Sequence, residues 1–423
     1  MQYPKEELLH HIWQHRLFQA QTLRTTDGLS LELVRPGRLN TDSGPDFRDA
    51  RIRTDGTEWA GNVEIHVRAS DWLLHRHQND DAFSNIILHV VFEDDLKTPL
   101  GPFPTLELRG LISDQVLRRY QHLSTSVDEL ACAPLFMEVP GPVRSIWLDS
   151  LLIARLQRKS EWMERVVEHN EGDLEQAFMA VLFRAFGMKV NAEPFELLAQ
   201  ATPWKVLGKH QDNLFQLEAI LFGNAGFLED PKDDHQLQLK TEYDFLRHKY
   251  DLRPMDRKLW KFLRLRPANF PTLRIAQLAA LFQRTGAFLN WFSRPQMHLE
   301  LEALRVIPSE YWRTHYSFGV ETKRSAKQIG AAMAQQLVIN SVVPFLFVTA
   351  QREARPELRD SSLAILQQLK PEQNSKVQCF ERSGMRPTNA GETQALIELK
   401  TNYCDHKKCL ICSIGANILK RDQ

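Results

Sequence analysis

Two carboxylates and a histidine near the start of the chain have the types and spacing of metal ligands. Residues two apart in a strand share a face, so Glu64 and His66 point to the same side of the alternating run 61–67 (GNVEIHV). Asp46 precedes a strand-like run that turns back at Asp55-Gly56, and this hairpin brings Asp46 towards Glu64 or His66. Such oxygen and nitrogen donors suit a hard or borderline divalent ion. We therefore predict a Mg²⁺ or Mn²⁺ site held by Asp46 and Glu64.

Hydrolysis of a phosphodiester uses such an ion, because the ion offsets charge on the phosphate and makes water nucleophilic near neutral pH. His75 and His77 follow the strand closely and could complete the coordination, move a proton or orient a ligand. His89 lies in the apolar run 86–92, and we expect it to be a hydrogen-bonded core histidine. The simpler alternative is a turn cap followed by a solvated strand face, and the sequence leaves both interpretations open.

Three of the five cysteines lie close together near the C-terminus: Cys404, Cys409 and Cys412. Thiolates at this spacing could share one Zn²⁺ ion or one [4Fe–4S] cluster. Cys379 or Cys132 would then supply the fourth ligand. An odd number of cysteines in a chain without a signal-peptide pattern argues against a disulfide framework. The alternative is a set of reduced thiols in a basic tail.

A basic stretch lies near the middle of the chain, where residues 247–274 contain nine Lys and Arg against two Asp and Glu. Arg257, Lys261 and Arg264 recur at i, i+4 and i+7, which predicts an amphipathic helix with a cationic face, and Arg266 follows it. Arginines contact phosphates and aromatic side chains stack on bases, so these residues are candidates for a DNA or RNA surface. The plainer alternative is an ordinary helix with solvated charges.

The elements that must position the first site form a small mixed α/β domain, predicted over residues 1–125. Apolar residues recur at helical spacing after Pro4, which predicts an opening helix. Asp27-Gly28 and Asp55-Gly56 predict hairpin turns. A short helix capped by Ser70 follows, and the run 86–92 has the composition of a central strand that is covered on both faces.

Helical patterns dominate from about residue 143 onward. We predict an α-helical domain over residues 142–370 and a C-terminal segment, residues 371–423, that carries the cysteine cluster. The expected fold class is therefore α+β. The predicted helices are 148–168, 174–186, 214–221, 257–264, 275–282 and 361–369.

The composition places few limits on function. The 423 residues include 53 Lys and Arg against 53 Asp and Glu, a balance that argues neither for nor against nucleic acid. No apolar run approaches the length of a membrane span, and the first residues lack a signal-peptide pattern. We expect a cytoplasmic protein without a membrane segment. The sequence does not indicate an oligomeric state.

The order helix, Pro45-Asp46, strand and Glu64-Ile65-His66 resembles the PD-(D/E)XK phosphodiesterase superfamily, which includes restriction enzymes and repair nucleases. The resemblance implies that Asp46 and Glu64 bind magnesium. In the superfamily a lysine two residues after the glutamate assists the attacking water, and here His66 stands in its place. The resemblance thus implies a metal-dependent nuclease for DNA or RNA, in which His75 or His77 moves a proton or supports the ligands.

Two alternatives accompany this interpretation. A catalytically inactive nuclease relative would bind nucleic acid or a partner protein and use the cysteine site as a structural clip. A metal hydrolase or oxygenase would instead use His66, His75 and His77, and its mark would be tight binding of iron or zinc. Ligation by Cys132 resembles iron–sulfur nucleases of the same superfamily, which pair one distant cysteine with three near the C-terminus.

A second resemblance extends over nearly the whole chain. Several short sequence motifs resemble those of an uncharacterised bacterial family, a domain of unknown function with the number twenty-eight fifty-one. This resemblance implies no activity. The motifs are GPDF (44–47), GNVEIH (61–66), SDW (70–72), LHVV (88–91), RPANFP (266–271), YC (403–404) and CLIC (409–412).

Overall fold

The chain forms two compact units. A computed structural model describes residues 3–19, 23–96, 98–285 and 301–421. Unit 1 consists of Met1–Leu148, Ser375–Met385 and Leu399–Gln423, and unit 2 consists of Asp149–Asn374 and Arg386–Glu398. The residues after 374 are therefore divided between the two units.

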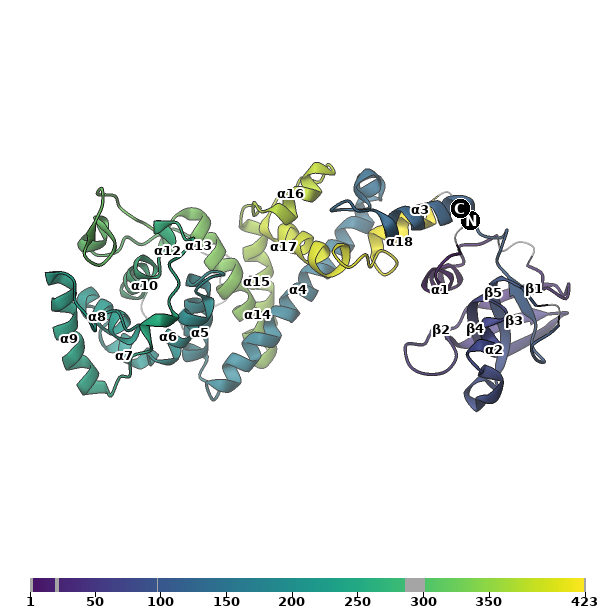
Figure 1. The fold of residues 1–423 in the computed structure, drawn as a ribbon, viewed down its shortest axis with the longest axis horizontal. Coiled ribbons are helices and arrows are strands. Elements are labelled where there is room, and N and C mark those ends of the chain that lie inside the picture. The colour runs from purple at the N-terminus through teal and green to yellow at the C-terminus, as the bar shows by residue number, and fades with distance from the viewer. Residues whose placement is uncertain (1–2, 20–22, 97, 286–300, 422–423) are drawn as a thin grey trace. The chain divides into compact units, whose positions relative to one another are not determined.

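Unit 1 is built on a mixed sheet of six strands among the described residues (Figure 1). The strands follow the order β1-β3-β4-β5-β6, with β2 paired to β3. β3 is antiparallel to β1, β2 and β4, whereas β5 is parallel to both β4 and β6. The bounds are β1 Leu31–Arg35, β2 Arg38–Leu39, β3 Phe47–Thr54, β4 Thr57–Arg68, β5 Ile86–Glu93 and β6 Thr105–Glu107.

The predicted Asp55-Gly56 hairpin is confirmed. Thr54 pairs with Thr57, and both turn residues have positive φ, 47° for Asp55 and 79° for Gly56. Such backbone conformations are the reason that Asp-Gly is favoured in two-residue hairpins. The Asp27-Gly28 turn joins only an isolated bridge between Arg24 and Ser30, and β1 pairs instead with β3.

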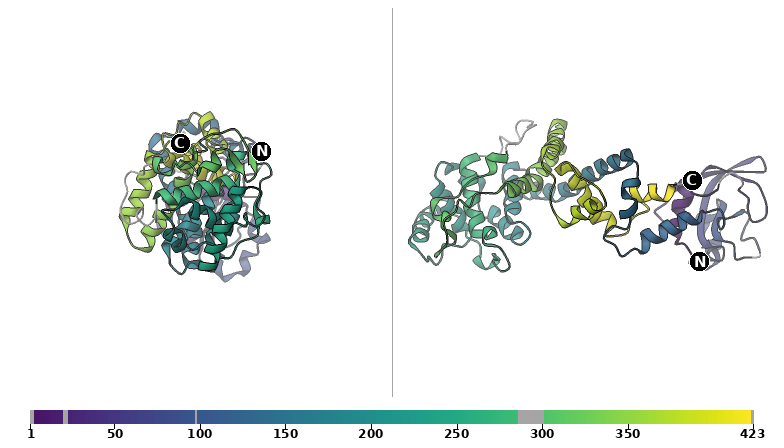
Figure 2. Two further views of the ribbon diagram at one scale, coloured as in Figure 1. Left: turned by 90° about the vertical axis from the view of Figure 1, so that its left-hand side faces the viewer. Right: turned by 90° about the horizontal axis from the view of Figure 1, so that it is seen from above.

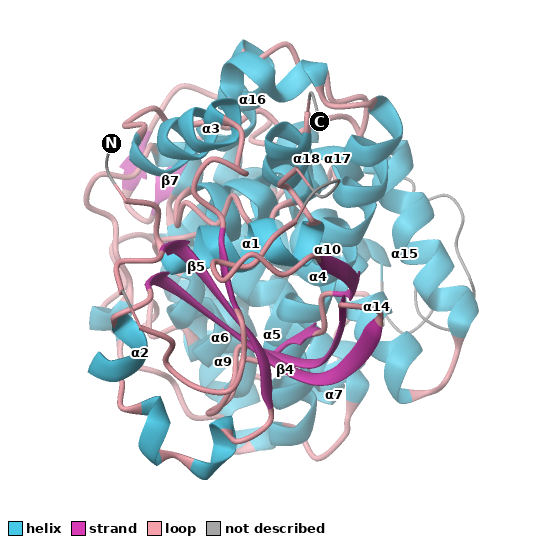
Figure 3. Ribbon diagram, turned by 90° about the vertical axis from the view of Figure 1, so that its right-hand side faces the viewer, coloured by secondary structure: helices cyan, strands magenta, loops and turns pink. Residues whose placement is uncertain are grey.

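The parallel pairing of β4 and β5 requires a crossover connection, because the chain must return to the same end of the sheet. The crossover contains α2 (Asp71–Leu74) and the 3₁₀ turns η1 (His77–Asn79) and η2 (Asp81–Phe83). Figure 3 shows α2 beside the sheet. The predicted cap by Ser70 is wrong in detail: its hydroxyl donates to Asp95 Oδ2 over 2.7 Å and makes no capping bond.

The other elements of unit 1 are helical. The predicted opening helix is confirmed as α1, which lies against β4. The central strand predicted at 86–92 is confirmed as β5, which has strands on both sides. The helical elements are α1 Glu6–His15, α3 Asp114–Thr125, η3 Ala133–Glu138, α16 Ser375–Arg382, the π-helical turn η8 Lys400–Cys404 and α18 Ser413–Lys420.

Unit 2 is mostly helical, as predicted (Figure 2). Its helices enclose one large apolar core. The first helix, α4, begins in unit 1 and continues into unit 2. The helices are α4 Gly141–His169, α5 Leu174–Phe186, α6 Ala192–Gln200, α7 Trp204–Lys209, α8 Leu214–Asn224, α9 Asp234–Tyr250, α10 Pro271–Thr285, α12 Leu301–Leu304, α13 Ala331–Leu337, α14 Val343–Arg352, α15 Pro356–Gln368 and α17 Ala390–Leu399. Between them lie η4 Arg257–Leu259, η5 Pro267–Asn269, η6 Glu310–Arg313, η7 Val338–Val342 and the strands β7 His315–Ser317 and β8 Val320–Glu321.

The predicted amphipathic helix at 257–264 is wrong. Only its first three residues are helical, as η4, and Arg264 has a positive φ of 62° that no regular helix contains. Its apolar residues do not form one buried face, since Trp260 is buried while Leu263 is 84% exposed. The basic side chains lie instead on an irregular exposed segment: Arg257, Lys261, Arg264 and Arg266.

One helical stretch in the described residues, Ala331–Arg352, is long and apolar enough to cross a membrane by length and composition. The expectation that no run approaches a membrane span was therefore too strong. However, 67% of its most apolar window is buried inside the protein, as in the core helix of a soluble protein.

Candidate metal centre

Two hydrogen bonds join Asp46, the residue before β3, to Glu64 and Ile65 of β4. The backbone N–H of Asp46 donates to Glu64 Oε2 over 3.0 Å, and the N–H of Ile65 donates to Asp46 Oδ2 over 3.0 Å. The hairpin register explains this contact, because Phe47 lies opposite Val63. The structure thus brings the Pro-Asp corner beside the Glu-x-His run, as the sequence pattern predicted.

The strand face that carries Glu64 and His66 is buried. Glu64 is 5% exposed and His66 is fully buried, which excludes the solvated strand face as an explanation of this pattern. The crossover between β4 and β5 covers this face, since both histidines of the crossover contact it. A buried carboxylate among imidazoles calls for a partner that offsets its charge.

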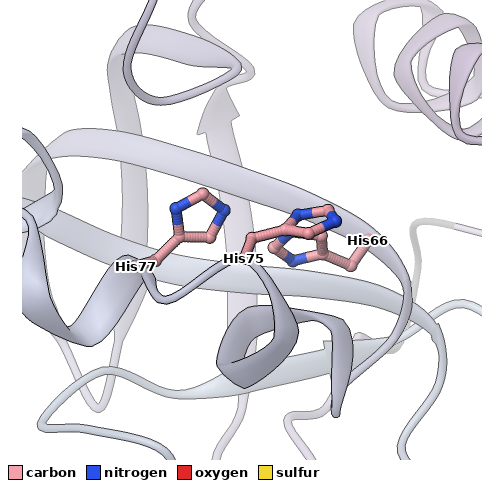
Figure 4. A group of neighbouring side chains, drawn as sticks. All are labelled: His66, His75 and His77. Carbon is pink, nitrogen blue, oxygen red and sulfur yellow. The ribbon is translucent and has the colours of Figure 1, made fainter.

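His75 and His77 of the crossover lie beside His66 of β4 (Figure 4), and His77 also contacts Glu64. His75 Nδ1 lies 3.1 Å from His66 Nε2, and His77 Nε2 lies 3.3 Å from Glu64 Oε1. Glu64 Oε1 is also 3.7 Å from His66 Nε2. One ring nitrogen from each histidine lies within 4.8 Å of the other two. His75 is exposed, so this group of donors reaches the surface.

Aromatic side chains fix these imidazoles. The ring of His77 stacks on Phe83 with centroids 3.9 Å apart. Trp72 is buried and presents its edge to both His66 and His77. Trp72 and Phe83 belong to a small apolar cluster under the crossover. The crossover therefore supplies both the ligand atoms and the packing that limits their movement.

His89 of β5 supports His66 from behind. It is fully buried, and its Nε2 lies 2.9 Å from His66 Nδ1. The prediction of a hydrogen-bonded core histidine is confirmed. A ligand histidine normally forms a hydrogen bond through its second ring nitrogen, which fixes the ring and its tautomer. His89 provides that bond for His66.

The surroundings change the charges of these groups. Burial, with a smaller contribution from the charge of Asp46, raises the pKa of Glu64 to about 8. Burial and the neighbouring imidazoles lower the pKa of His66 to about 2 and also lower that of His77. Both imidazoles are therefore neutral near pH 7, which is the form that binds metals.

Two residues of α1 extend the centre and were missed by the sequence analysis. His10 Nε2 lies 3.1 Å from Asp46 Oδ2 and 3.9 Å from Glu6 Oε1. Ligand atoms of Glu6, His10 and Asp46 all lie within 4.8 Å of one another. The available signal was the i, i+4 spacing of Glu6 and His10, which places both on one face of a helix.

The donor atoms fit a divalent cation. A tetrahedral site with metal–nitrogen distances of about 2.0 Å has its donors about 3.3 Å apart. Three distances lie near this value: 3.1 Å for His66–His75, 3.3 Å for His77–Glu64 and 3.7 Å for His66–Glu64. The ring nitrogens of the three histidines all lie within 4.8 Å of one another. In addition, His77 Nε2 is buried and has no hydrogen-bond partner among the described residues. A cation would give this nitrogen a partner and would stabilise the ionised form of Glu64, whose pKa is otherwise raised.

Comparison with known proteins gives a family. Residues 6–375 match the model of the family described as protein of unknown function (DUF2851). The chain belongs to this family. Neither a curated protein nor a solved structure matches the chain. The part that matches the DUF2851 family contains every residue of the candidate metal centre, while Cys404, Cys409 and Cys412 lie beyond its end.

A groove of about 980 Å³ runs beside α1 in this DUF2851 protein. Its basic and imidazole side chains come from α1 and from the segment around α18: Lys5, His10, His11, His15, His406, Lys407, Lys408 and Lys420. Glu7 is the acidic residue on its wall. Since His10 also contacts Asp46, the groove borders the metal centre.

The structure brings four of the five predicted cysteine ligands together and leaves Cys379 apart. Cys132, Cys404, Cys409 and Cys412 line one small cavity in unit 1. Cys379 lies outside that cavity lining, and its Sγ donates to the carbonyl of Lys376 in its own helix, α16.

Proposed function

We propose that unit 1 is a metal-dependent phosphodiesterase that acts on DNA or RNA. The observation that carries the proposal is the convergence of His66, His75 and His77, whose ring nitrogens lie within 4.8 Å of one another, beside Glu64, whose Oε1 lies 3.3 Å from His77 and 3.7 Å from His66. When bound, such a cation offsets the negative charge of a phosphodiester and makes water nucleophilic near neutral pH.

The donor set favours Mn²⁺ or Zn²⁺ over Mg²⁺. Imidazole suits zinc and iron, whereas magnesium prefers an octahedral shell of oxygen atoms and keeps several waters. The sequence predicts Mg²⁺ or Mn²⁺ on Asp46 and Glu64, with His75 and His77 as groups that could complete the coordination. Because the structure places three imidazoles beside Glu64, we expect the site to prefer another metal ion over Mg²⁺.

Glu6, His10 and Asp46 would form the second half of the centre. Asp46 joins the halves, because its N–H holds the Glu64 carboxylate and its own carboxylate lies against His10. Partial burial lowers the pKa of His10, but the contact with Asp46 and the charge of Glu6 outweigh burial and raise it overall. A protonated His10 is suited to give a proton to a leaving group.

The groove beside α1 supports a polyanionic substrate. Its four lysines, Lys5, Lys407, Lys408 and Lys420, could contact successive phosphates, and His10 lies where the groove meets the metal centre. The exposed basic residues Arg257, Lys261, Arg264 and Arg266 of unit 2 are a separate candidate surface for nucleic acid. Because these residues do not form a helix, they lack the regular cationic face that the sequence predicted as a nucleic-acid surface.

The test combines metal binding with cleavage. Protein freed of metal should bind Mn²⁺ or Zn²⁺ by calorimetry, and the loaded protein should cleave labelled DNA or RNA. Glu64→Gln and His66→Ala should weaken metal binding by more than about 100-fold and abolish cleavage, because each removes a donor atom. Glu58→Gln is the matched control, since Glu58 lies at the exposed end of the same strand and should change neither property.

The outcomes separate the proposal from its alternatives. Cleavage that persists in Glu64→Gln and His66→Ala would exclude this centre as its source. Metal binding and nucleic-acid binding without cleavage would instead support the inactive nuclease relative. Iron binding with consumption of oxygen would indicate an oxygenase.

We further propose a cytoplasmic location. All five cysteines are free thiols in the structure. Unpaired cysteines in this number are typical of a reducing compartment.

A further inference from the structure

Four cysteines that are far apart in the sequence surround one cavity in unit 1. The cavity between them is small, with a volume of about 20 Å³. Cys132 enters from the segment after α3, Cys404 ends η8, and Cys409 and Cys412 lie in the loop before α18. The remaining wall is largely apolar, with Leu399, Tyr403 and Ile414 among its residues.

The chain is arranged to bring these thiols together. A Cβ atom at Gly415 would lie only 2.2 Å from the carbonyl oxygen of Cys409, so only glycine allows the cysteine loop to approach α18 this closely. The tail also docks on the α3 region, where Lys407 Nζ donates to the Ser126 carbonyl over 2.7 Å. α18 packs against α3 itself. Cys132 follows α3, so this docking places it beside the tail cysteines.

Donor groups surround the sulfur atoms. The backbone N–H groups of Gly415 and Ile414 and the indole of Trp147 lie near the sulfur of Cys412, to which they can donate. The indole N–H of Trp147 is buried and has no hydrogen-bond partner among the described residues. Lys407 lies near Cys409. These groups suit sulfur that carries negative charge.

We propose that Cys132, Cys404, Cys409 and Cys412 hold a [4Fe–4S] cluster that joins the C-terminal tail to the segment after α3. Among the described cysteines the sulfur atoms are spread more widely than one zinc ion requires. Zinc–sulfur distances of about 2.3 Å require sulfurs about 3.8 Å apart, whereas a cubane cluster separates them by roughly 6 Å. All five cysteines are described, and no three of their sulfurs lie within 4.8 Å of one another.

This inference selects Cys132 over Cys379 as the fourth ligand. Cys379 is buried, but its thiol donates to a carbonyl of its own helix over 2.9 Å and lies outside the cavity lining. Its role is that of a small apolar residue in the core. Cys379→Ser is therefore a matched control for Cys132→Ser.

The experiment is anaerobic purification of the full chain, followed by absorbance and by iron, sulfide and zinc analysis. The wild type should be brown, absorb at about 400 nm and contain about four iron and four sulfide per chain. Cys132→Ser and Cys409→Ser should lose most of the iron and colour, and Cys379→Ser should keep both. The wild-type spectrum and metal content need no variant, so misfolding of a variant cannot hide the answer.

Several results would overturn the inference. Colourless protein with one zinc per chain would replace the cluster with a zinc site. Iron that depends on Cys379 and not on Cys132 would overturn the ligand assignment. Protein that contains no metal and takes up no cluster when incubated with ferrous iron and sulfide under reducing conditions would leave four buried thiols as a packing feature. Because these measurements require no nuclease activity, they are independent of the proposed function.

Discussion

Glu64 takes part in both halves of the candidate centre. One of its oxygens accepts the Asp46 N–H, and the other lies near His66 and His77. The sequence pattern was sufficient to place Asp46, Glu64 and His66 together, because strand alternation and one Asp-Gly turn determine their positions. Glu6 and His10 could not be placed in the same way, since their proximity to Asp46 depends on how α1 packs on the sheet.

The raised pKa of Glu64 predicts a pH dependence of the metal-free protein. The folded state keeps a proton on Glu64 up to about pH 8, whereas the unfolded chain releases it near 4.5. Between these values the folded state binds more protons, so the free energy of unfolding should fall as pH rises, by up to roughly 1 kcal/mol per pH unit.

Glu64→Gln removes this titration and therefore tests whether Glu64 makes the free energy of unfolding fall as pH rises. Denaturant unfolding of metal-free wild type and variant should show that the wild type loses more stability than the variant between about pH 5.5 and 7.5. Glu58→Gln should behave as the wild type, because Glu58 lies at the exposed end of β4. Parallel pH profiles for wild type and Glu64→Gln would contradict the buried state of this carboxyl.

Among the elements, the crossover between β4 and β5 determines whether a centre can form. A parallel pair needs a connection that returns across one face of the sheet, and this connection carries His75 and His77 over Glu64 and His66. The sequence indicated the strands and the short helix, but it did not indicate parallel pairing. Without knowledge of the parallel pairing, the positions of His75 and His77 relative to Glu64 and His66 could not be predicted.

Trp72 is expected to maintain the crossover. Trp72→Ala should cost about 3–5 kcal/mol of stability, because it leaves a cavity under α2, and should weaken Mn²⁺ or Zn²⁺ binding by freeing His77. Trp72→Phe should retain most of the stability and most of the metal affinity. Trp59→Ala is the control on β4, where the side chain is 51% exposed. Calorimetry and thermal unfolding measure the two effects, and normal metal affinity in Trp72→Ala would refute this role.

The segment 257–264 shows where helical periodicity misleads. Three charges at i, i+4 and i+7 predicted a helix, but a helix in a folded domain also needs an apolar face that can be buried. Here Trp260 is buried and its N–H donates to the Ala225 carbonyl, while Leu263 lies exposed. By contrast, α5 was predicted with its observed bounds, because its apolar residues are buried almost throughout.

At the scale of the whole molecule, two units with separate cores should respond differently to loss of metal. Anything that binds only the folded state raises stability by mass action, so chelation should destabilise unit 1 selectively. Hydrogen exchange should become faster in β4 and β5 after treatment with a chelator and stay unchanged in α5, α8 and α10. Equal acceleration in both units would contradict metal sites confined to unit 1.

The division of the chain also has a consequence for its synthesis. Unit 1 begins with the first residues but includes Leu399–Gln423, so it is complete only after residues 149–398 have been translated. At 5–20 residues per second this delay is on the order of tens of seconds. During that interval α18, which packs on α3, has not yet been synthesised. Cys132 is then present in the nascent chain without Cys404, Cys409 and Cys412, the other proposed ligands. A cluster-assembly factor would therefore meet all four cysteines only after residue 412 has been translated.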